Sequence, residues 1–275
     1  MKKNYLLIIL AILISFINCE KKMNLSQFEM EQTSDFIDDA AIDSLQPKKI
    51  LFGHASVGFN IIDGIEKLAV KDARLQKIAI QEITDVDSIN TGGLYHIINR
   101  KNGFPRIKCD NFKKLLQENN FGAQFDIAFF KFCYVDFDKD SDVQAIFDYY
   151  VETIDSIKTA FPRLKIVHVT TPLYAHAFGT RGFIGSFVKK DLANIKRNQF
   201  NELMRKKYQD RESIFDLAQV ESEYPDGTRV TFKEDGTSYY SLAHEHTDDG
   251  GHLNAIGSFY AARTLLKILA NTALQ

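Results

Sequence analysis

Two segments near opposite ends of the sequence carry residues whose types and spacing suit nucleophilic catalysis. Ser56 lies between a short apolar run and a stretch with helical periodicity, and Asp249 and His252 stand three positions apart in a glycine-containing segment. An imidazole held by a carboxylate takes the proton of a serine hydroxyl, which activates the oxygen as a nucleophile. The two segments together predict a Ser–His–Asp triad.

Each of these residues also has a simpler explanation. Ser56 directly precedes residues 57–70, whose apolar side chains recur at helical spacing, and serine is a frequent N-cap of helices. Asp249 suits a turn, and His252 suits the exposed start of a helix. These explanations account for the residues one at a time, so the combination favours catalysis.

The elements that must position the two segments alternate between strand and helix. Apolar runs predict strands at 50–52, 77–83, 125–133, 164–169 and 213–217, and helical periodicity predicts helices at 57–70, 111–119, 143–159, 191–208 and 254–270. Residues 85–105 are predicted to form a long functional loop. The alternation predicts a three-layer α/β/α sandwich with a mostly parallel central sheet, whose ligands bind at the carboxyl ends of the strands.

The sequence resembles the SGNH/GDSL hydrolase family across residues 48–275. Residues 53–56, Gly-His-Ala-Ser, are similar to the family's Gly-Asp-Ser block, and residues 249–254, Asp-Gly-Gly-His-Leu-Asn, to its Asp-x-x-His block. The resemblance implies Ser56 as nucleophile and the Asp249–His252 pair as its orienter and base. It also implies ester hydrolysis without a cofactor or metal, in particular the removal of an acyl group such as acetyl from a carbohydrate.

The middle of the sequence fits the family pattern less closely. The family has a Gly after its second strand and a Gly-x-Asn after its third, and both donate to the oxyanion. Gly92 or Gly93 stands for the first, whereas residues 131–136 contain no Asn, so the replacement is either the phenol of Tyr134 or a donor from elsewhere in the chain. His54 stands near the position of the family's Asp and is expected to lie at the oxyanion or substrate. These departures leave open a non-catalytic surface binding protein on the same fold.

Two further groups of polar residues are candidates for binding. His176 and Arg181 follow the fourth predicted strand, where they either contact a substrate hydroxyl or carboxylate or lie solvated on a loop. His244, His246 and Asp248 have the donor types that Zn²⁺ accepts, which leaves a metal-assisted hydrolase as a second alternative. No predicted helix carries the histidines at metalloprotease spacing.

The N-terminal segment predicts export. An apolar run over residues 5–17 follows two lysines and is shorter than the ~20 residues that span a bilayer. Because Cys19 closes this run, the segment resembles a bacterial lipoprotein signal, in which that cysteine is acylated and anchors the chain to a membrane of the cell envelope. An uncleaved signal anchor is the alternative. Residues 20–47 are predicted to be a polar tether, and 48–275 one domain.

Composition limits the remaining classes. With 34 Lys and Arg against 36 Asp and Glu, the net charge of −2 gives no global positive field, so no nucleic-acid partner is expected. Trp is absent, so any platform for stacking a sugar must be Tyr or Phe. Cys109 and Cys133 lack the spacing of a metal site, and we expect both to be free and buried.

Overall fold

The structure is a computed structural model that describes residues 37–84, 89–176 and 186–275. The expected signal segment with Cys19, most of the expected tether, and Arg181 lie outside these residues. Within the three described ranges, no helix combines the length and the apolar character needed to cross a membrane.

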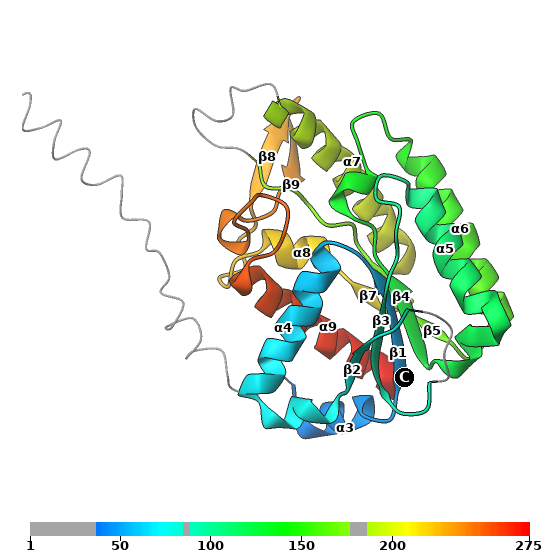
Figure 1. The fold of residues 1–275 in the computed structure, drawn as a ribbon. Coiled ribbons are helices and arrows are strands. Elements are labelled where there is room, and N and C mark those ends of the chain that lie inside the picture. Colours follow the sequence, from blue (N-terminus) through cyan, green and yellow to red (C-terminus); the bar gives the residue numbers. More distant parts are fainter. Residues whose placement is uncertain (1–36, 85–88, 177–185) are drawn as a thin grey trace, which may run out of the picture. The chain divides into compact units, whose positions relative to one another are not determined.

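Five parallel strands form the central sheet, in the order β2-β3-β1-β4-β5 (Figure 1). The strands are β1 (Lys49–His54), β2 (Ile80–Glu82), β3 (Gly93–Ile98), β4 (Ile127–Phe130) and β5 (Lys165–Ile166). A further parallel pair, β6 (His168–Val169) with β7 (Ile214–Phe215), follows in the chain. Because β1 lies between β3 and β4, the segments that leave these three strands meet at one edge of the sheet.

Helices cover both faces of the sheet, as Figure 1 shows. One face carries α3 (Asp39–Leu45), α4 (Val57–Lys71), α8 (Leu217–Ser222) and α9 (Ala255–Leu274), and the other carries α5 (Pro105–Gln117), α6 (Val143–Ala160) and α7 (Ser186–Tyr208). Successive residues of β1 point to opposite faces, so Ile50 and Phe52 join one hydrophobic core and Leu51 joins the other. The predicted three-layer α/β/α sandwich is confirmed.

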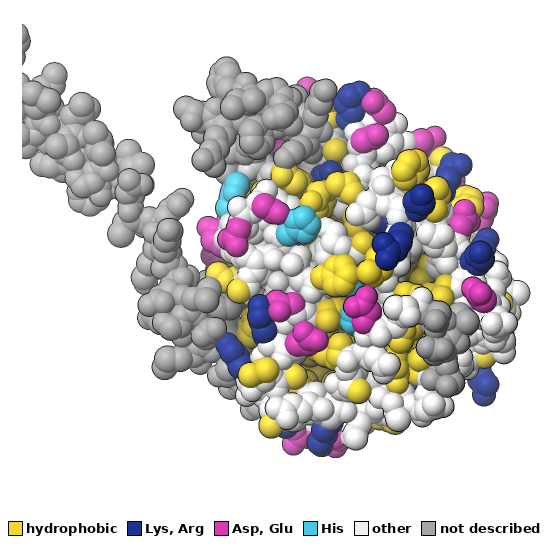
Figure 2. Space-filling view, in the orientation of Figure 1, with side chains coloured by type: hydrophobic (Ala, Val, Ile, Leu, Met, Phe, Trp, Pro, Cys, Tyr) yellow, Lys and Arg dark blue, Asp and Glu magenta, His cyan; other side chains and the backbone are white. Residues whose placement is uncertain are grey.

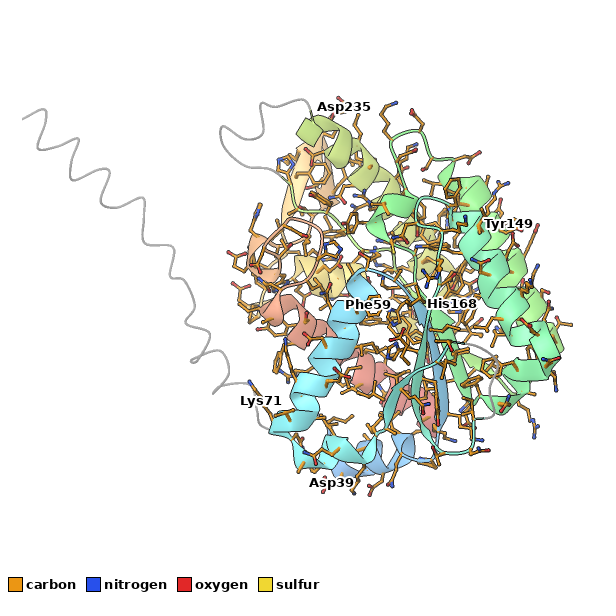
Figure 3. All side chains as sticks on the ribbon, in the orientation of Figure 1. Asp39, Phe59, Lys71, Tyr149, His168 and Asp235 are labelled. Atoms are coloured by element: carbon orange, nitrogen blue, oxygen red, sulfur yellow. The ribbon has the colours of Figure 1, made fainter. Side chains whose placement is uncertain are left out.

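Helix α4 begins directly after Ser56 and turns the chain back along β1. Its buried residues Ile61, Ile65 and Leu68 recur at helical spacing and pack in the core beneath α9. Figure 3 labels Phe59 near the first end of this helix and Lys71 at its last residue. The start of α4 therefore lies at the carboxyl edge of the sheet.

Two expectations about the first half of the chain are wrong. Strand β3 lies inside the segment expected to be an irregular loop, and α5 begins at Pro105, six residues earlier than expected. The run from Leu94 to His96 is buried within the sheet. It was not predicted as a strand because it is short and directly follows two glycines. The domain also begins before residue 48, because α3 places Ile42 and Leu45 in the core beside α9.

Candidate active site

Ser56 lies in the turn between β1 and α4. Its backbone has φ +54° and ψ −116°, a conformation that a residue with a Cβ adopts only where the surrounding structure enforces it. Although Ser56 holds the N-cap position of α4, its side chain makes no capping hydrogen bond. The explanation of Ser56 as a helix cap is therefore wrong, and its hydroxyl serves another partner.

Asp249 and His252 lie in the turn that precedes α9. Oδ1 of Asp249 accepts hydrogen bonds from the backbone N–H groups of Gly251 and His252, both at 2.8 Å. Its other oxygen, Oδ2, lies 2.6 Å from Nδ1 of His252. Gly250 has φ +87°, a left-handed conformation that glycine adopts without steric cost. One carboxylate thus fixes both the backbone of the turn and the orientation of the imidazole.

The imidazole of His252 joins the two turns. Its Nε2 lies 2.8 Å from Oγ of Ser56, although the residues are 196 positions apart in the sequence. Because an ionised carboxylate only accepts hydrogen bonds, Nδ1 of His252 carries the ring proton and Nε2 accepts from the serine hydroxyl. Ser56, His252 and Asp249 therefore lie in the order nucleophile, base and orienter.

The carboxylate of Asp249 is ionised at neutral pH. Burial raises the pKa of this group, but hydrogen bonds from the backbone and ring of His252 and from the N–H of Gly251 outweigh that effect and lower the pKa below its ordinary value of 3.8. The side chains of His252 and Asp249 are 43% and 58% exposed, so the base is open to solvent. An incoming molecule can reach it from outside.

Two loops flank Ser56, since β3 and β4 lie on either side of β1. The β3 loop (residues 99–104) and the β4 loop (residues 131–137) are joined through Asp136. Its Oδ1 accepts from the N–H of Gly103 at 2.6 Å, and its Oδ2 accepts from the N–H of Cys133 at 2.6 Å. Oδ2 also lies 2.7 Å from Nζ of Lys108, and both side chains of this ion pair are fully buried.

The buried ion pair fixes the two loops relative to each other. The ammonium of Lys108 also donates to Oδ1 of Asn102 at 2.8 Å. Separating two buried charges would leave each one desolvated without its partner, which is costly. Nothing in the sequence marked Asp136 as more than a loop charge, because its partner lies 28 positions earlier on a helix.

Comparisons with known proteins bear on the fold. No protein-family model and no curated protein matches this sequence. The structure is similar to that of a proposed acylhydrolase from Bacteroides fragilis, with a TM-score of 0.52 and 14% identity over 82% of this chain and 88% of the other. A GDSL-like lipase from Bacteroides thetaiotaomicron aligns with a TM-score of 0.49 and 9% identity, over 85% of this chain and 99% of the other.

The chain has the three-layer α/β/α fold of this acylhydrolase. At 14% identity, the similarity extends to the fold alone. The parallel sheet, the nucleophile turn after its central strand and the acid–base turn before the last helix match the order that the sequence resemblance implied. This chain is thus a divergent representative of that fold.

His54 does not face the open side of the fold, so its expected role at the oxyanion or substrate is wrong. The ring is fully buried, and its Nε2 lies 3.1 Å from Nδ1 of His96. Burial, with contributions from the cation of Lys131 and from His96, lowers the pKa of His54 to about 3, so the ring is neutral. A Cβ on Gly58 would lie 2.4 Å from the Cβ of His54, so only glycine allows α4 to pass this close.

Gly92 and Gly93 lie at the opposite edge of the sheet from Ser56. Gly93 is the first residue of β3 and pairs with Lys49, the first residue of β1. Six strand residues separate that edge from the nucleophile turn, a length of about 20 Å at roughly 3.3 Å per residue. Their expected role as oxyanion donors is therefore wrong. The β3 loop, with Gly103, occupies the carboxyl edge instead.

Tyr134 lies beside the acid–base turn. Its ring is 5.7 Å from that of His252 in an edge-to-face arrangement, and its backbone oxygen accepts from Nε of Arg197 at 2.7 Å. Burial and the nearby carboxylate of Asp249 raise the pKa of its phenol, which is therefore protonated and able to donate. A Cβ on Gly251 would come within 2.8 Å of this ring.

His176 lies near the acid–base turn because the preceding residue, Ala175, is hydrogen-bonded to that turn. The N–H of Ala175 donates to the oxygen of Gly250 at 2.8 Å, and Nδ1 of His176 lies 2.9 Å from the carboxylate of Asp191. The ring of His176 stacks on that of Phe232, with centroids 5.1 Å apart. His176 is thus a structured residue of the site's surroundings and not a solvated loop side chain.

His244 and His246, two of the expected metal ligands, form hydrogen bonds with different partners. Nε2 of His244 donates to the oxygen of His176 at 2.8 Å, whereas His246 is buried with Nδ1 3.2 Å from the oxygen of Glu221. Among the residues that the structure describes, no three His, Cys, Asp or Glu side chains are placed to hold a metal ion. Cys109 and Cys133 are free and buried, as expected.

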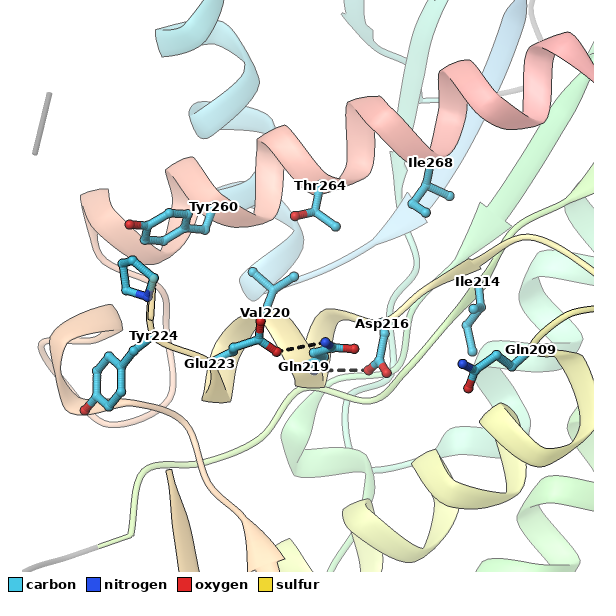
Figure 4. Close-up of a pocket in the computed structure, with 11 residues that line it drawn as sticks. Gln209, Ile214, Asp216, Gln219, Val220, Glu223, Tyr224, Tyr260, Thr264 and Ile268 are labelled. Carbon is cyan, nitrogen blue, oxygen red and sulfur yellow. Dashed lines mark hydrogen bonds between the residues drawn. The ribbon is translucent and has the colours of Figure 1, made fainter. Parts of the chain in front are cut away.

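A pocket of about 460 Å³ lies between α8 and α9, away from the triad (Figure 4). Its polar side chains are engaged locally: Asp216 accepts from Nε of Arg205 at 2.6 Å, and Glu223 accepts from Nε2 of Gln219 at 2.8 Å. None of the lining residues belongs to the triad. The site we assign is therefore the edge that carries Ser56.

Proposed function

We propose that this chain is a serine hydrolase that cleaves carboxylic esters. The single observation that supports this proposal is the hydrogen-bonded series Ser56, His252 and Asp249, with separations of 2.8 and 2.6 Å at the carboxyl edge of a parallel sheet. The fold is consistent with it. A binding protein would need neither the strained backbone of Ser56 nor the alignment of base and carboxylate.

The reaction follows from this geometry. Oγ of Ser56 attacks the ester carbonyl while Nε2 of His252 takes its proton, giving a tetrahedral oxyanion. The imidazolium, stabilised by Asp249, then protonates the leaving alcohol, and the C–O bond breaks to leave an acyl-enzyme. Water, deprotonated by His252, attacks the acyl carbon and releases the acid, which restores the Ser56 hydroxyl.

The oxyanion requires hydrogen-bond donors near Ser56. We assign these to the backbone N–H of Ser56 and to N–H groups of the β3 loop, which the buried Lys108–Asp136 pair holds in place. The phenol of Tyr134 is the proposed third donor, because the β4 loop has no Asn.

The role of Tyr134 is tested by Tyr134→Phe. Loss of one oxyanion donor costs on the order of 3 kcal/mol of transition-state stabilisation, so kcat should fall about 10²-fold with little change in KM. Steady-state hydrolysis of a p-nitrophenyl ester measures both constants. An unchanged kcat would remove Tyr134 from the oxyanion site and leave the triad untouched.

The proposed substrate is an acylated, most simply acetylated, carbohydrate. The proposal rests on the family resemblance and on the expected export of the chain with Cys19 as its acylated anchor at the cell envelope. Cys19→Ala should then shift the protein from the membrane fraction to a soluble or unprocessed form. Unchanged fractionation and an unchanged N-terminal mass would contradict the anchor but not the activity.

The function itself is tested by covalent labelling. A fluorophosphonate should react with Ser56, identified by peptide mass, and the His252→Ala variant should label far more slowly because the serine is no longer activated. Ester hydrolysis should also survive chelation and dialysis. Absence of both labelling and turnover on acetylated sugars and short esters would favour the binding protein, and loss of activity that Zn²⁺ restores would favour the metal alternative.

A further inference from the structure

Residues 100–107, which we call the basic segment, form a positively charged and partly apolar surface. Their sequence is Arg-Lys-Asn-Gly-Phe-Pro-Arg-Ile, without an acidic residue. Two of the apolar side chains are open to solvent, with Phe104 58% and Ile107 38% exposed. In Figure 2, Lys and Arg side chains lie beside hydrophobic ones on the visible face, in the area where Figure 1 draws the connection from β3 to α5.

The cations of this segment are not ion-paired in the part of the chain that the structure describes. Arg100, Lys101 and Arg106 are exposed, and none forms an ion pair with any residue that the structure describes. Arg106 instead lies over the ring of Tyr149, 5.4 Å from its centroid. Five cations elsewhere that are at least partly exposed are paired with carboxylates, namely those of Lys67, Arg74, Lys77, Lys139 and Lys158. A local positive potential therefore remains at the basic segment despite the net charge of −2.

The basic segment begins beside the nucleophile. The N–H of Asn99 donates to the oxygen of His54 at 2.7 Å, so Arg100 leaves the sheet next to the strand end that carries Ser56. Further along, Gly103 is tied to Asp136, and Asp136 to the buried Lys108. The segment is thus fixed at its start and in its middle, and its cations are presented from a defined backbone.

We propose that the basic segment is a substrate subsite that binds an acidic group, and that the ester cleaved at Ser56 is therefore carried by an acidic carbohydrate. Guanidinium and ammonium groups bind carboxylate through charge-assisted hydrogen bonds, and Arg can do so with two parallel bonds. The exposed ring of Phe104 offers an apolar face for the C–H groups of a sugar. This inference rests on the proposed esterase function.

The experiment compares acidic and neutral substrates in matched variants of the full chain. The double variant Arg100→Gln/Lys101→Gln removes two charges from the subsite, and the control Lys206→Gln/Lys207→Gln removes two adjacent charges from the last turn of α7. Acetate release is followed on O-acetylated oligogalacturonides and on O-acetylated xylo-oligosaccharides. We expect the first variant to raise KM about tenfold on the acidic substrate and not on the neutral one, and the second to change KM on neither substrate. Equal effects of the two variants, or equal effects on the two substrates, would overturn the subsite.

Binding measured without turnover separates this inference from the function. In the Ser56→Ala background, calorimetric titration with trigalacturonate should show saturable binding that Arg100→Gln/Lys101→Gln weakens about tenfold, while xylotriose binds equally to both. If binding behaves in this way but the parent chain cleaves no ester, the esterase proposal fails and the acidic subsite stands. If esters are cleaved but trigalacturonate does not bind, the subsite fails and the esterase proposal stands.

Discussion

Two carboxylates organise the two sides of the nucleophile, and they do so over very different distances in the sequence. Asp249 makes its strong contacts to Gly251 and His252, no more than three positions away. Asp136 joins Cys133, three positions away, to Gly103 and Lys108, which are 33 and 28 positions away. The first carboxylate is partly exposed, and the second is fully buried.

The comparison distinguishes a charge pair with a catalytic role from a charge pair with a structural role. The exposed pair of Asp249 and His252 sets a proton acceptor in place while it stays open to solvent, so its loss should act mainly on the rate. The buried pair of Asp136 and Lys108 does not itself contact the reacting atoms, but it holds in place the two loops that carry the proposed oxyanion donors. Its loss should act first on stability.

The largest effect is expected from the nucleophile and the base. Ser56→Ala and His252→Ala should each lower kcat about 10⁶-fold, and the double variant should lose little more, because the two side chains act as one unit. Hydrolysis of a p-nitrophenyl ester gives the rates, and an unchanged melting temperature shows that the fold is retained. Additive losses would mean that the two residues act independently, against the hydrogen bond between them.

The orienting carboxylate is expected to have the next largest effect. Asp249→Asn keeps the shape of the side chain but removes the acceptor that fixes the imidazole tautomer, so kcat should fall about 10⁴-fold with little loss of stability. The control is Asp248→Asn, the same change one position earlier. If both variants are equally active, Asp249 is a turn residue and not an orienter.

The buried pair should show the opposite behaviour. Asp136→Asn leaves the ammonium of Lys108 buried without its counter-charge, so the free energy of unfolding should fall by about 3–5 kcal/mol, measured by urea denaturation. Asp140→Asn makes the same change at the exposed Lys139–Asp140 pair and should alter stability little. A smaller loss at Asp136 than at Asp140 would show that the buried pair does not hold the loops.

The last prediction is a pH dependence of stability from Glu221, a third, fully buried carboxyl group. Burial raises its pKa to about 8, although the N–H of Leu173 and the cations of Lys131 and Arg197 oppose the shift. Between pH 4.5 and 8 the folded chain holds a proton that the unfolded chain has released, so stability should fall as pH rises through this window. The slope approaches about 1.4 kcal/mol per pH unit.

Glu221→Gln removes this titration and should flatten the decline in urea-unfolding free energy between pH 5 and 8. The exposed Glu202→Gln is the control and should keep the parent slope. If the decline persists unchanged in Glu221→Gln, the side chain is ionised in the folded state at neutral pH, and one of its cationic neighbours compensates it fully.

Prediction from sequence succeeded where short-range pattern was strong. Helices 57–70 and 143–159 were placed within one residue of their observed ends, because their apolar residues keep helical spacing over at least three turns. Strand β3 was overlooked because its partners, β1 and β2, come from elsewhere in the chain. With β3 overlooked, Gly92 and Gly93 were placed at the wrong edge of the sheet.

The sandwich and the acid–base turn could both be predicted from the sequence, since the alternation of strands and helices and the spacing of Asp249 and His252 are local patterns. The spacing of Asp249 and His252 was enough to predict their pairing. Only the tertiary structure decided that Ser56 meets His252 across 196 positions, that His54 is buried, and that Asp136 joins the loops beside the nucleophile. The physical reason is that burial and long-range pairing depend on which strands become neighbours, and the order β2-β3-β1-β4-β5 is a property of the folded sheet and not of any local segment.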